Sequence, residues 1–195
     1  MLRVENVRVY DLKESVIACR NSMRLELPEY TNEEFEKSLE RAKKLAPLGG
    51  GHSNFLSGIR VAFDLVYPNY ISPELQRYTF LKIVNSSSKM HKLYMMDIGK
   101  CCNKYVTENT IKEVSALQKA YLESPTYENF MRLVSNCPQG IELFMRCTTN
   151  YLCLRNIFAR NIYSQRKSHR LAEDWSAFCD FIRSLPYAKE FLLDD

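Results

Sequence analysis

Glycine and proline are scarce in this chain, with six Gly and seven Pro among 195 residues. Tyrosine and phenylalanine are common by contrast, at twelve and ten, and apolar residues make up 46% of the total. This balance excludes collagen-like, low-complexity and intrinsically disordered chains. A chain of this length can bury a substantial core, and we expect residues 1–195 to form a single domain.

Long apolar runs are also missing. No window approaches the ~20 apolar residues that a helix needs to cross a bilayer. The first residues, Met-Leu-Arg-Val-Glu, lack the apolar stretch of a secretory signal. We therefore expect a cytoplasmic protein.

Spacings that hold metal ions are absent. The seven cysteines are an odd number, no Cys-x-x-Cys pair occurs, and the three histidines are scattered. Structural zinc sites need closely spaced ligands, and disulfide frameworks belong mainly to small exported domains. The sequence therefore predicts free thiols and no metal site. The net charge of +4 is mild for a protein that coats nucleic acid.

Periodicity and capping signals predict the elements of the N-terminal half. A strand is expected at 2–10, and a helix starts at 15–19. The clearest helix spans 31–46, where Thr31 and Glu34 form a capping box. Its apolar face comprises Phe35, Leu39, Ala42 and Ala46.

Alternating residues predict a half-buried strand over 59–65, ended by Pro68. Ser72-Pro73 and Ser124-Pro125 each predict a helix start, with serine as the N-cap and proline at the first helical position. The segment between these two starts includes a helix at 107–123.

The C-terminal third is mostly helical by pattern. Residues 141–147 fit either a strand or a buried turn of helix, and a helix of about twenty residues follows from Thr149. Another apolar stripe runs from Leu171 to Ile182. Several helices with a few strands that do not alternate regularly with them predict an α+β fold, with a small mixed or antiparallel sheet packed against helices.

Two polar clusters could bind an anion. Residues 85–91 (Asn-Ser-Ser-Ser-Lys-Met-His) offer several donors that can converge on a phosphate, and an ordinary turn at a helix exit is the alternative. Residues 155–170 concentrate basic groups that form either a solvated face or an anion-binding face. These groups are Arg155, Arg160, Arg166, Lys167, His169 and Arg170.

Protein-borne nucleophilic catalysis has no support in the sequence. None of the common nucleotide-binding loops or nucleophile motifs is present. His52 follows Gly49-Gly50-Gly51, which either lets a ligand approach the backbone or simply stops the preceding helix. Chemistry, if the chain performs any, would be carried by a cofactor.

Two blocks of sequence together resemble flavin-dependent thymidylate synthases. The first comprises residues 51–64, 76–78 and 85–91, and the second comprises 148–152 and 165–171. Their order and spacing agree over roughly residues 50–185.

The signature of this family is Arg-His-Arg-x-x-Ser-x-Asn-Glu-x-Ser-x-Arg. Aligned without a gap from Arg77, the chain keeps Arg77 and Ser87 and has Lys89 at the last position. It departs elsewhere, with Tyr78 in place of the His and Thr79 in place of the second Arg. The chain is therefore a divergent branch if it belongs to the family.

The resemblance implies a mechanism without a catalytic protein residue. FAD reduced by NADPH passes a hydride to dUMP, and methylenetetrahydrofolate supplies the one-carbon unit of dTMP. The enzymes of this family are homotetramers that build each site from several subunits. Nucleotide-binding residues implied by the resemblance are Ser87, Lys89 and Arg166, the last through an inferred five-residue insertion, and the implied flavin-binding residues are His52, Asn54, Arg77 and Asn150.

Three alternatives stay open, and the first is modification of a closely related deoxypyrimidine nucleotide in place of the methylation of dUMP. A homologue that keeps a nucleotide pocket without catalysis would explain the degraded signature. A nucleic-acid-binding protein would instead use the basic helix at 155–170.

Overall fold

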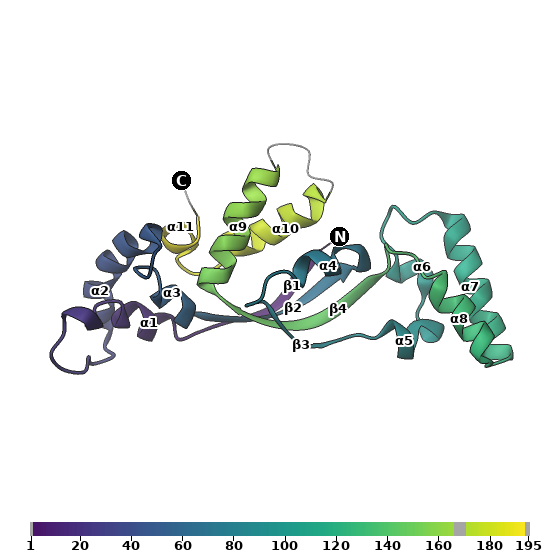
Figure 1. Ribbon diagram of the computed structural model, residues 1–195, viewed down its shortest axis with the longest axis horizontal. Helices are drawn as coiled ribbons and strands as arrows, with labels where there is room; N and C mark the ends of the chain where they lie inside the picture. Colours follow the sequence, from purple (N-terminus) through teal and green to yellow (C-terminus); the bar gives the residue numbers. More distant parts are fainter. Residues whose placement is uncertain (1, 166–170, 194–195) are drawn as a thin grey trace.

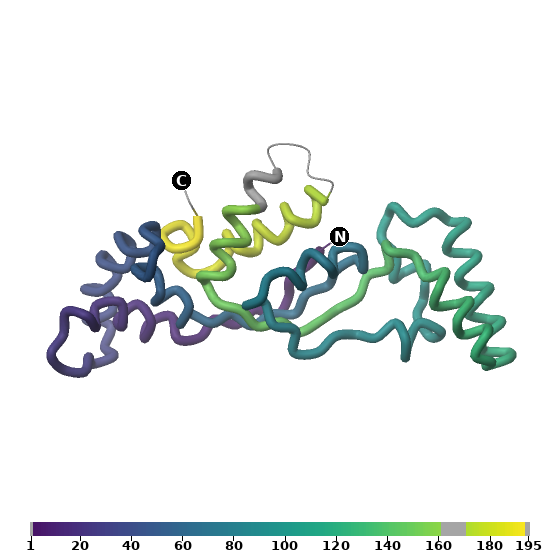
Figure 2. Tube along the Cα trace, viewed as in Figure 1, coloured from purple at the N-terminus to yellow at the C-terminus, as the bar shows by residue number. Residues whose placement is uncertain are grey.

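The computed structural model describes residues 2–165 and 171–193. Figures 1 and 2 show an elongated molecule with a curved sheet in the middle and a group of helices at each end. The predicted α+β class is confirmed, and every strand pairing in the described residues is antiparallel.

The sheet has four strands in the order β1-β2-β4-β3. They are β1 (Arg3–Tyr10), β2 (Arg60–Pro68), β3 (Lys82–Ser86) and β4 (Glu142–Asn150). The undecided segment at 141–147 is therefore a strand. A bulge interrupts the register of β1 between Glu5 and Arg8, where Asn6 has a positive φ of 50°.

Five short or medium elements form the end of the molecule drawn at the left of Figure 1. They are α1 (Leu12–Ala18), η1 (Asn21–Met23), α2 (Asn32–Leu45), η2 (Ala46–Leu48) and α3 (Phe55–Gly58). The predicted apolar face of α2 is buried, which confirms the helix and its orientation.

The opposite end is a second group of helices. It comprises α5 (Lys89–Lys92), η4 (Leu93–Met95), α6 (Ile98–Cys101), α7 (Glu108–Glu123) and α8 (Tyr127–Ser135). This group buries its own small cluster around Val114 and Leu133, separate from the main core.

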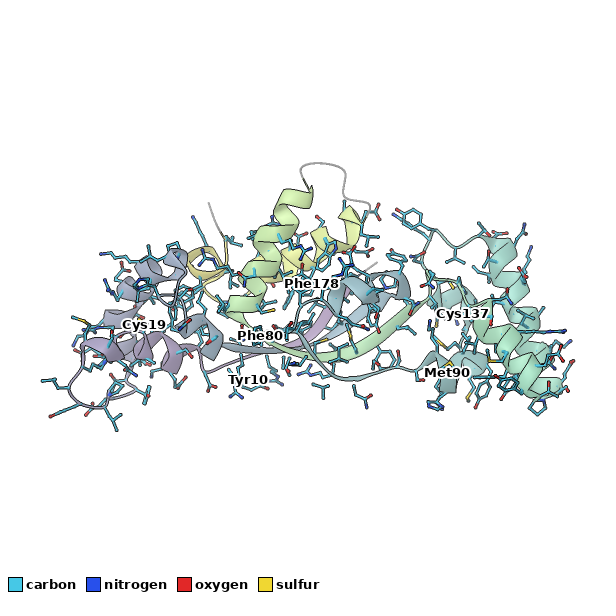
Figure 3. All side chains as sticks on the ribbon, in the orientation of Figure 1. Tyr10, Cys19, Phe80, Met90, Cys137 and Phe178 are labelled. Atoms are coloured by element: carbon cyan, nitrogen blue, oxygen red, sulfur yellow. The ribbon has the colours of Figure 1, made fainter. Side chains whose placement is uncertain are left out.

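In the part of the chain that the structure describes, helices cover one face of the sheet and leave the other face bare. Figure 1 shows the C-terminal helices and α4 on the same side of the sheet. These elements are η3 (Asn69–Ile71), α4 (Ser72–Leu75), α9 (Tyr151–Gln165), α10 (Ala172–Arg183) and α11 (Ala188–Phe191). Phe63 of β2 packs against Phe178 and Phe181 of α10, at ring-centroid distances of 6.0 and 5.0 Å. Figure 3 shows Phe178 above the sheet and Tyr10 below it.

Three predicted capping arrangements differ from the structure. Thr31 does cap α2, because its hydroxyl accepts the Glu34 N–H at 3.1 Å, but the Glu34 carboxylate binds Arg20 and Arg24 instead of returning to Thr31. Ser72 is the first residue of a single turn, not an N-cap, because η3 leads directly into it.

At the start of α8 the cap is Thr126 and not Ser124. The Thr126 hydroxyl accepts the Asn129 N–H at 3.2 Å, whereas Ser124 already ends α7. Proline favours an extended preceding residue, so Pro125 separates the two helices rather than opening the second one.

All seven cysteines are free thiols, as the sequence predicts. None of the described helices is long and apolar enough to cross a membrane.

Candidate functional site

A cavity of about 1080 Å³ lies between α1, α2, α3 and the loop that precedes α3. Its volume is at the upper end of small-molecule pockets, which run from roughly 300 to 1,000 Å³. His52 and Asn54, two of the predicted flavin-binding residues, line this α1–α2 cavity. Two of the four predicted flavin-binding residues therefore share one cavity.

Three glycines shape the loop beside this cavity. Gly49, Gly50 and Gly51 have φ values of 63°, 56° and 96°, in the left-handed region that side chains rarely adopt. The His52 N–H closes the turn by donating to the Gly49 carbonyl at 2.9 Å. The glycines thus have a conformational role, and this role brings His52 to the cavity wall.

The helix α2 contributes a row of cations to the same wall. Lys37, Arg41 and Lys44 are spaced four and three residues apart, so they share one face of the helix. Lys37 pairs with Glu33 at 2.6 Å. Within the described part of the chain, Arg41 and Lys44 have no carboxylate partner, and they are the cations best placed to receive an anion.

Cys19 is half-buried in the wall of the α1–α2 cavity. Burial raises the pKa of its thiol, and the nearby positive charges of Arg20 and Arg41 oppose the rise without cancelling it. The group is therefore a neutral thiol at pH 7, not a thiolate nucleophile.

A second cavity of about 360 Å³ adjoins the first, because Ser57 lines both. Asn150, the third predicted flavin-binding residue, lies in its wall. We call it the Asn150 cavity. Cross-strand pairing explains its composition, since Tyr10, Arg60 and Asn150 are consecutive partners across β1, β2 and β4.

Cations and aromatic rings meet in the Asn150 cavity. Lys82 and Arg60 line it together with Tyr10 and Phe80. Arg60 already pairs with Asp11 at 2.6 Å, whereas Lys82 has no ion-pair partner in the described residues. An aromatic face beside an uncommitted cation suits a planar ring that carries a negative group.

One buried polar atom in this wall lacks a partner. Thr149 is 6% exposed, and its Oγ1 makes no hydrogen bond within the described residues. It lies near the Cys153 thiol, a weak hydrogen-bond partner, and the contact offsets part of the rise that burial causes in the pKa of this thiol but falls short of a full hydrogen bond. A buried hydroxyl without a hydrogen bond is costly, so a ligand that contacts it would gain affinity.

Asn150 itself also has a structural task. Its Oδ1 accepts the backbone N–H of Cys153 at 2.9 Å, in the first turn of α9. The side chain thus caps the helix, as an asparagine before a helix commonly does. Any contact with a ligand would come in addition to this cap.

Arg77, the fourth predicted flavin-binding residue, lies in the exposed turn after α4 and lines neither cavity. The next residue, Tyr78, stands at the His position of the family signature and packs against Trp175 at a centroid distance of 6.0 Å. This segment therefore anchors the turn to α10.

Ser87 extends the sheet beyond β3. Its N–H donates to the Phe144 carbonyl at 2.8 Å, and its Oγ accepts the Phe144 N–H at 3.0 Å. Phe144 and Asn150 are six residues apart on β4, which corresponds to ~20 Å. In one copy of the chain, Ser87 and Asn150 are thus near opposite ends of β4.

The rest of the polar cluster continues away from both cavities. Asn85 and Ser86 belong to β3, so the expectation of a helix exit is wrong for them. Ser88 is the N-cap of α5 and accepts the His91 N–H at 3.3 Å, and Lys89 is the first helical residue. Arg166 lies outside the described residues.

The basic segment at 155–170 is only partly described. Arg155 donates a hydrogen bond to the Ala46 carbonyl and so holds α9 against the end of α2. Arg183 of α10 lies over the Phe158 ring at 5.1 Å. At least one basic side chain of this segment, that of Arg155, therefore has a structural role.

The cations of α2 that line the first cavity were not predicted as site residues, although the sequence held one signal for them. Lys37, Arg41 and Lys44 follow helical spacing within a helix that was predicted correctly. The Asn150 cavity gave no such signal, because Tyr10, Arg60 and Lys82 meet only through the register of the sheet.

No protein-family model and no curated protein sequence matches the chain. Several solved structures, however, match the fold of the chain. Flavin-dependent thymidylate synthase ThyX from Helicobacter pylori, complexed with FAD and dUMP, has a TM-score of 0.71 at 14% identity, covering 98% of this chain and 100% of that chain. A second structure of ThyX from the same organism, also with FAD and dUMP, has a TM-score of 0.73 at 14% identity, covering 100% and 98%. The chain therefore has the fold of the flavin-dependent thymidylate synthase ThyX.

Proposed function

We propose that the chain is a flavin-dependent enzyme that methylates dUMP to dTMP, with methylenetetrahydrofolate and NADPH as co-substrates. The observation that carries the proposal is the pair of adjoining cavities, whose walls hold His52, Asn54 and Asn150. The likeness in fold to enzymes solved with FAD and dUMP supports the same assignment.

The donor groups in these walls fit a flavin dinucleotide. The uncommitted cations Arg41 and Lys44 suit its pyrophosphate, since charge-assisted contacts are the strong ones. The orphaned hydroxyl of Thr149 and the rings of Tyr10 and Phe80 suit a planar heterocycle with polar edges. FAD bound here and reduced by NADPH would supply the hydride that passes to the pyrimidine ring of dUMP.

The protein's own residues would position the reactants and neutralise the phosphate charges rather than react themselves. The thiol of Cys19 in the first cavity has a raised pKa, and so does that of Cys153 beside Thr149, so neither is a thiolate at pH 7. Holding the reactants at a fixed distance and balancing the phosphate charges are then the contributions left to the chain.

The nucleotide would be held by residues of more than one copy. Ser87 pairs with Phe144, which lies six residues, or ~20 Å, along β4 from Asn150 in the same chain, and Lys89 follows Ser87 beyond the end of β3. A homotetramer in which another copy presents Ser87, Lys89 and Arg166 would complete the site. The main chain and side chain of Ser87 are already used in the sheet, so Lys89 and Arg166 would carry most of the phosphate binding.

A second candidate is a homologue that binds nucleotide without catalysis. It is favoured by the structural roles of two signature positions, because Tyr78 packs on Trp175 and the Ser87 hydroxyl pairs with Phe144. Such a protein would keep the fold and a pocket but lose the flavin.

Purified protein separates the two candidates. The enzyme would carry or take up FAD, and would oxidise NADPH only when dUMP and methylenetetrahydrofolate are both present. A protein that binds dUMP but takes up no FAD, with no coupled oxidation, would contradict the first proposal and support the second.

The role of the α2 cations in the α1–α2 cavity can be tested with a matched pair of double variants. Arg41→Ala/Lys44→Ala should weaken FAD binding by about a hundredfold or more, because it removes two charge-assisted contacts of about 1.5–3 kcal/mol each. Lys112→Ala/Lys119→Ala removes the same charge from exposed positions on α7 and should leave FAD binding unchanged. Equal affinity in both variants would place the dinucleotide elsewhere.

A further inference from the structure

Large aromatic rings stand in water on the face of the sheet that the described helices leave bare. Tyr10, Phe80 and Phe144 are 47%, 66% and 63% exposed. Strand alternation places Tyr10 and Phe144 on this face, and Figure 3 shows Tyr10 on the opposite side of the sheet from Phe178. Phe80 comes just before β3 and lines the Asn150 cavity together with Tyr10. Exposed rings grouped in one region mark a surface where another molecule binds.

A row of four side chains crosses this bare face, one from each strand. Arg8 pairs with Ala62, Ala62 pairs with Thr148, and Thr148 pairs with Lys82. We call these four residues the Arg8–Lys82 row. Ala62 and Thr148 are small, so they form a low floor between two long cations at the edges of the sheet. Ala62, Thr148 and Lys82 also line the Asn150 cavity, which therefore opens onto this floor.

The two cations of this row are available to a ligand. Other charges on and beside the bare face pair with one another: Asp11 with Arg60, Asp64 with Arg146, and both Glu5 and Glu142 with Arg3. Arg8 and Lys82 have no ion-pair partner among the residues that the structure describes. A ligand that brings two negative charges to the row therefore meets two uncommitted cations, and no unpaired carboxylate of this group opposes it.

Rings and cations are spread along the sheet rather than gathered at one point. Tyr10 lies in the same cross-strand row as Asn150, whereas Phe144 lies six residues, or ~20 Å, along β4 from Asn150. Thr148, and with it the Arg8–Lys82 row, lies between these two ends. A small molecule that fills the Asn150 cavity does not reach Phe144, but a chain of bases joined by phosphates does. Bases stacked on exposed rings, with their phosphates beside cations, are the typical contacts of a bound single strand.

Thr148 favours RNA over DNA as this strand. Its side chain is exposed within the row, and its hydroxyl has no hydrogen bond in the described part of the chain. A free hydroxyl between two phosphate-binding cations can bond the 2′-hydroxyl of a ribose, which DNA lacks. A duplex keeps its bases stacked inside and offers none of them to exposed rings, so the strand that fits is a single one.

We propose that the bare face of the sheet binds single-stranded RNA. Its bases stack on Tyr10, Phe80 and Phe144, and the phosphates between them lie at Arg8 and Lys82. This inference goes beyond the proposed function and overlaps it only at the Asn150 cavity, since the cations of the α1–α2 cavity lie outside the bare face. The RNA contacts use side chains of one copy of the chain.

The cations are tested by fluorescence anisotropy of a fluorescein-labelled uridine decamer, titrated with the full-length chain at several salt concentrations. The parent should bind saturably and lose affinity as salt rises. Arg8→Ala/Lys82→Ala should weaken binding by about tenfold or more and flatten the slope of log affinity against log salt by about 1.4, or ~0.7 for each lost phosphate contact. Lys112→Ala/Lys119→Ala, on α7, removes the same charge and should leave affinity and slope unchanged.

The rings are tested in the same titration. Tyr10→Ala/Phe144→Ala should weaken binding by about tenfold or more and keep the salt slope of the parent, because stacking involves no phosphate. Tyr30→Ala/Tyr127→Ala removes two exposed rings outside the bare face and should bind as the parent does. The substituted side chains are exposed, so circular dichroism should show an unchanged fold in every variant.

Three results would overturn the RNA proposal. They are a parent that does not bind the decamer, control variants that weaken binding as much as the bare-face variants do, and a thymidine DNA decamer or an RNA duplex that binds as tightly as the single RNA strand. Flavin absorbance of the same samples tests the flavin proposal separately. RNA binding by a chain that takes up no FAD would contradict the flavin proposal alone, and FAD uptake by a chain that binds no RNA would contradict the RNA proposal alone.

Discussion

The two ends of the molecule are built differently. The α1–α3 end shares its buried residues with the main core, so Leu39 and Phe55 belong to the same cluster as Phe63 of the sheet. The α5–α8 end buries a cluster of its own around Leu133. Its described backbone links to the rest include the Cys102–Ile141 bridge and the Asn103 N–H to Gly140 carbonyl bond at 2.9 Å. The cavities lie at the end that is continuous with the core, where their walls are held in place.

The largest effect should come from the shared core. Phe63→Ala removes a ring that is packed against Phe178 and Phe181, and it should lower the free energy of unfolding by about 3–5 kcal/mol. Because the α1–α3 end shares this core, denaturant unfolding should shift for the whole sheet and both cavities together. A loss of stability confined to one end of the molecule would contradict the conclusion that the α1–α3 end shares its core with the sheet.

Leu133→Ala should have a local effect instead. The residue is fully buried in the small cluster, so its loss should cost about 2–5 kcal/mol of that cluster's stability. Since small cooperative units can open separately, amide hydrogen exchange should accelerate in α7 and α8 and stay unchanged in α9 and α10. Equal acceleration in all four helices would show that the ends unfold as one.

Gly58 and Gly140 precede β2 and β4, and substitutions at these two glycines should have smaller effects on stability. A Cβ on Gly140 would lie 2.5 Å from Val106 Cγ2 and 2.8 Å from Asn103 Oδ1, whereas one on Gly58 would meet the Ser15 hydroxyl. Gly140→Ala should therefore cost about 1–3 kcal/mol and loosen the α5–α8 end. Gly58→Ala should be rescued by Ser15→Ala, because removing the hydroxyl opens the space. Thermal unfolding of the single and double variants measures both effects.

The smallest effect concerns Glu34, which joins Arg20 and Arg24. Its hydrogen bond with Arg24 lowers the pKa of this carboxyl below the ordinary 4.5. The folded state thus favours the carboxylate, and the stability it contributes is present above about pH 4.5 and lost as the pH falls through the lowered value. Glu34→Gln should reduce the melting temperature at pH 7 and should match the parent in stronger acid. A difference that persists in acid would rule out this charge as its cause.

Local signals predicted the elements whose pattern is long. The helices at 31–46 and 107–123 have capping threonines and three or more turns, and both are present within a residue or two. Shorter signals were outweighed by their neighbours. Ser72 follows a 3₁₀ turn and Ser124 ends a helix, so neither is free to cap. Residues 141–147 became a strand because β2 and β3 flank them, which no local pattern reveals.

The candidate site was predictable only in part for the same reason. His52 and Asn54 follow a glycine run that is visible in the sequence, and they reach a cavity. Ser87 and Lys89 were grouped with them by resemblance, yet Ser87 lies most of the length of β4 away from Asn150 in one chain. Whether distant segments meet depends on strand register and on assembly, neither of which a single sequence encodes locally.

The elongated arrangement in Figure 1 has a practical consequence for studying assembly. A rod-like particle of 22.9 kDa diffuses more slowly than a sphere of the same mass. Gel-filtration columns calibrated with round standards will therefore overstate its size, and an early-eluting monomer will resemble a dimer. Sedimentation velocity, which yields the frictional ratio together with the mass, would tell shape from stoichiometry.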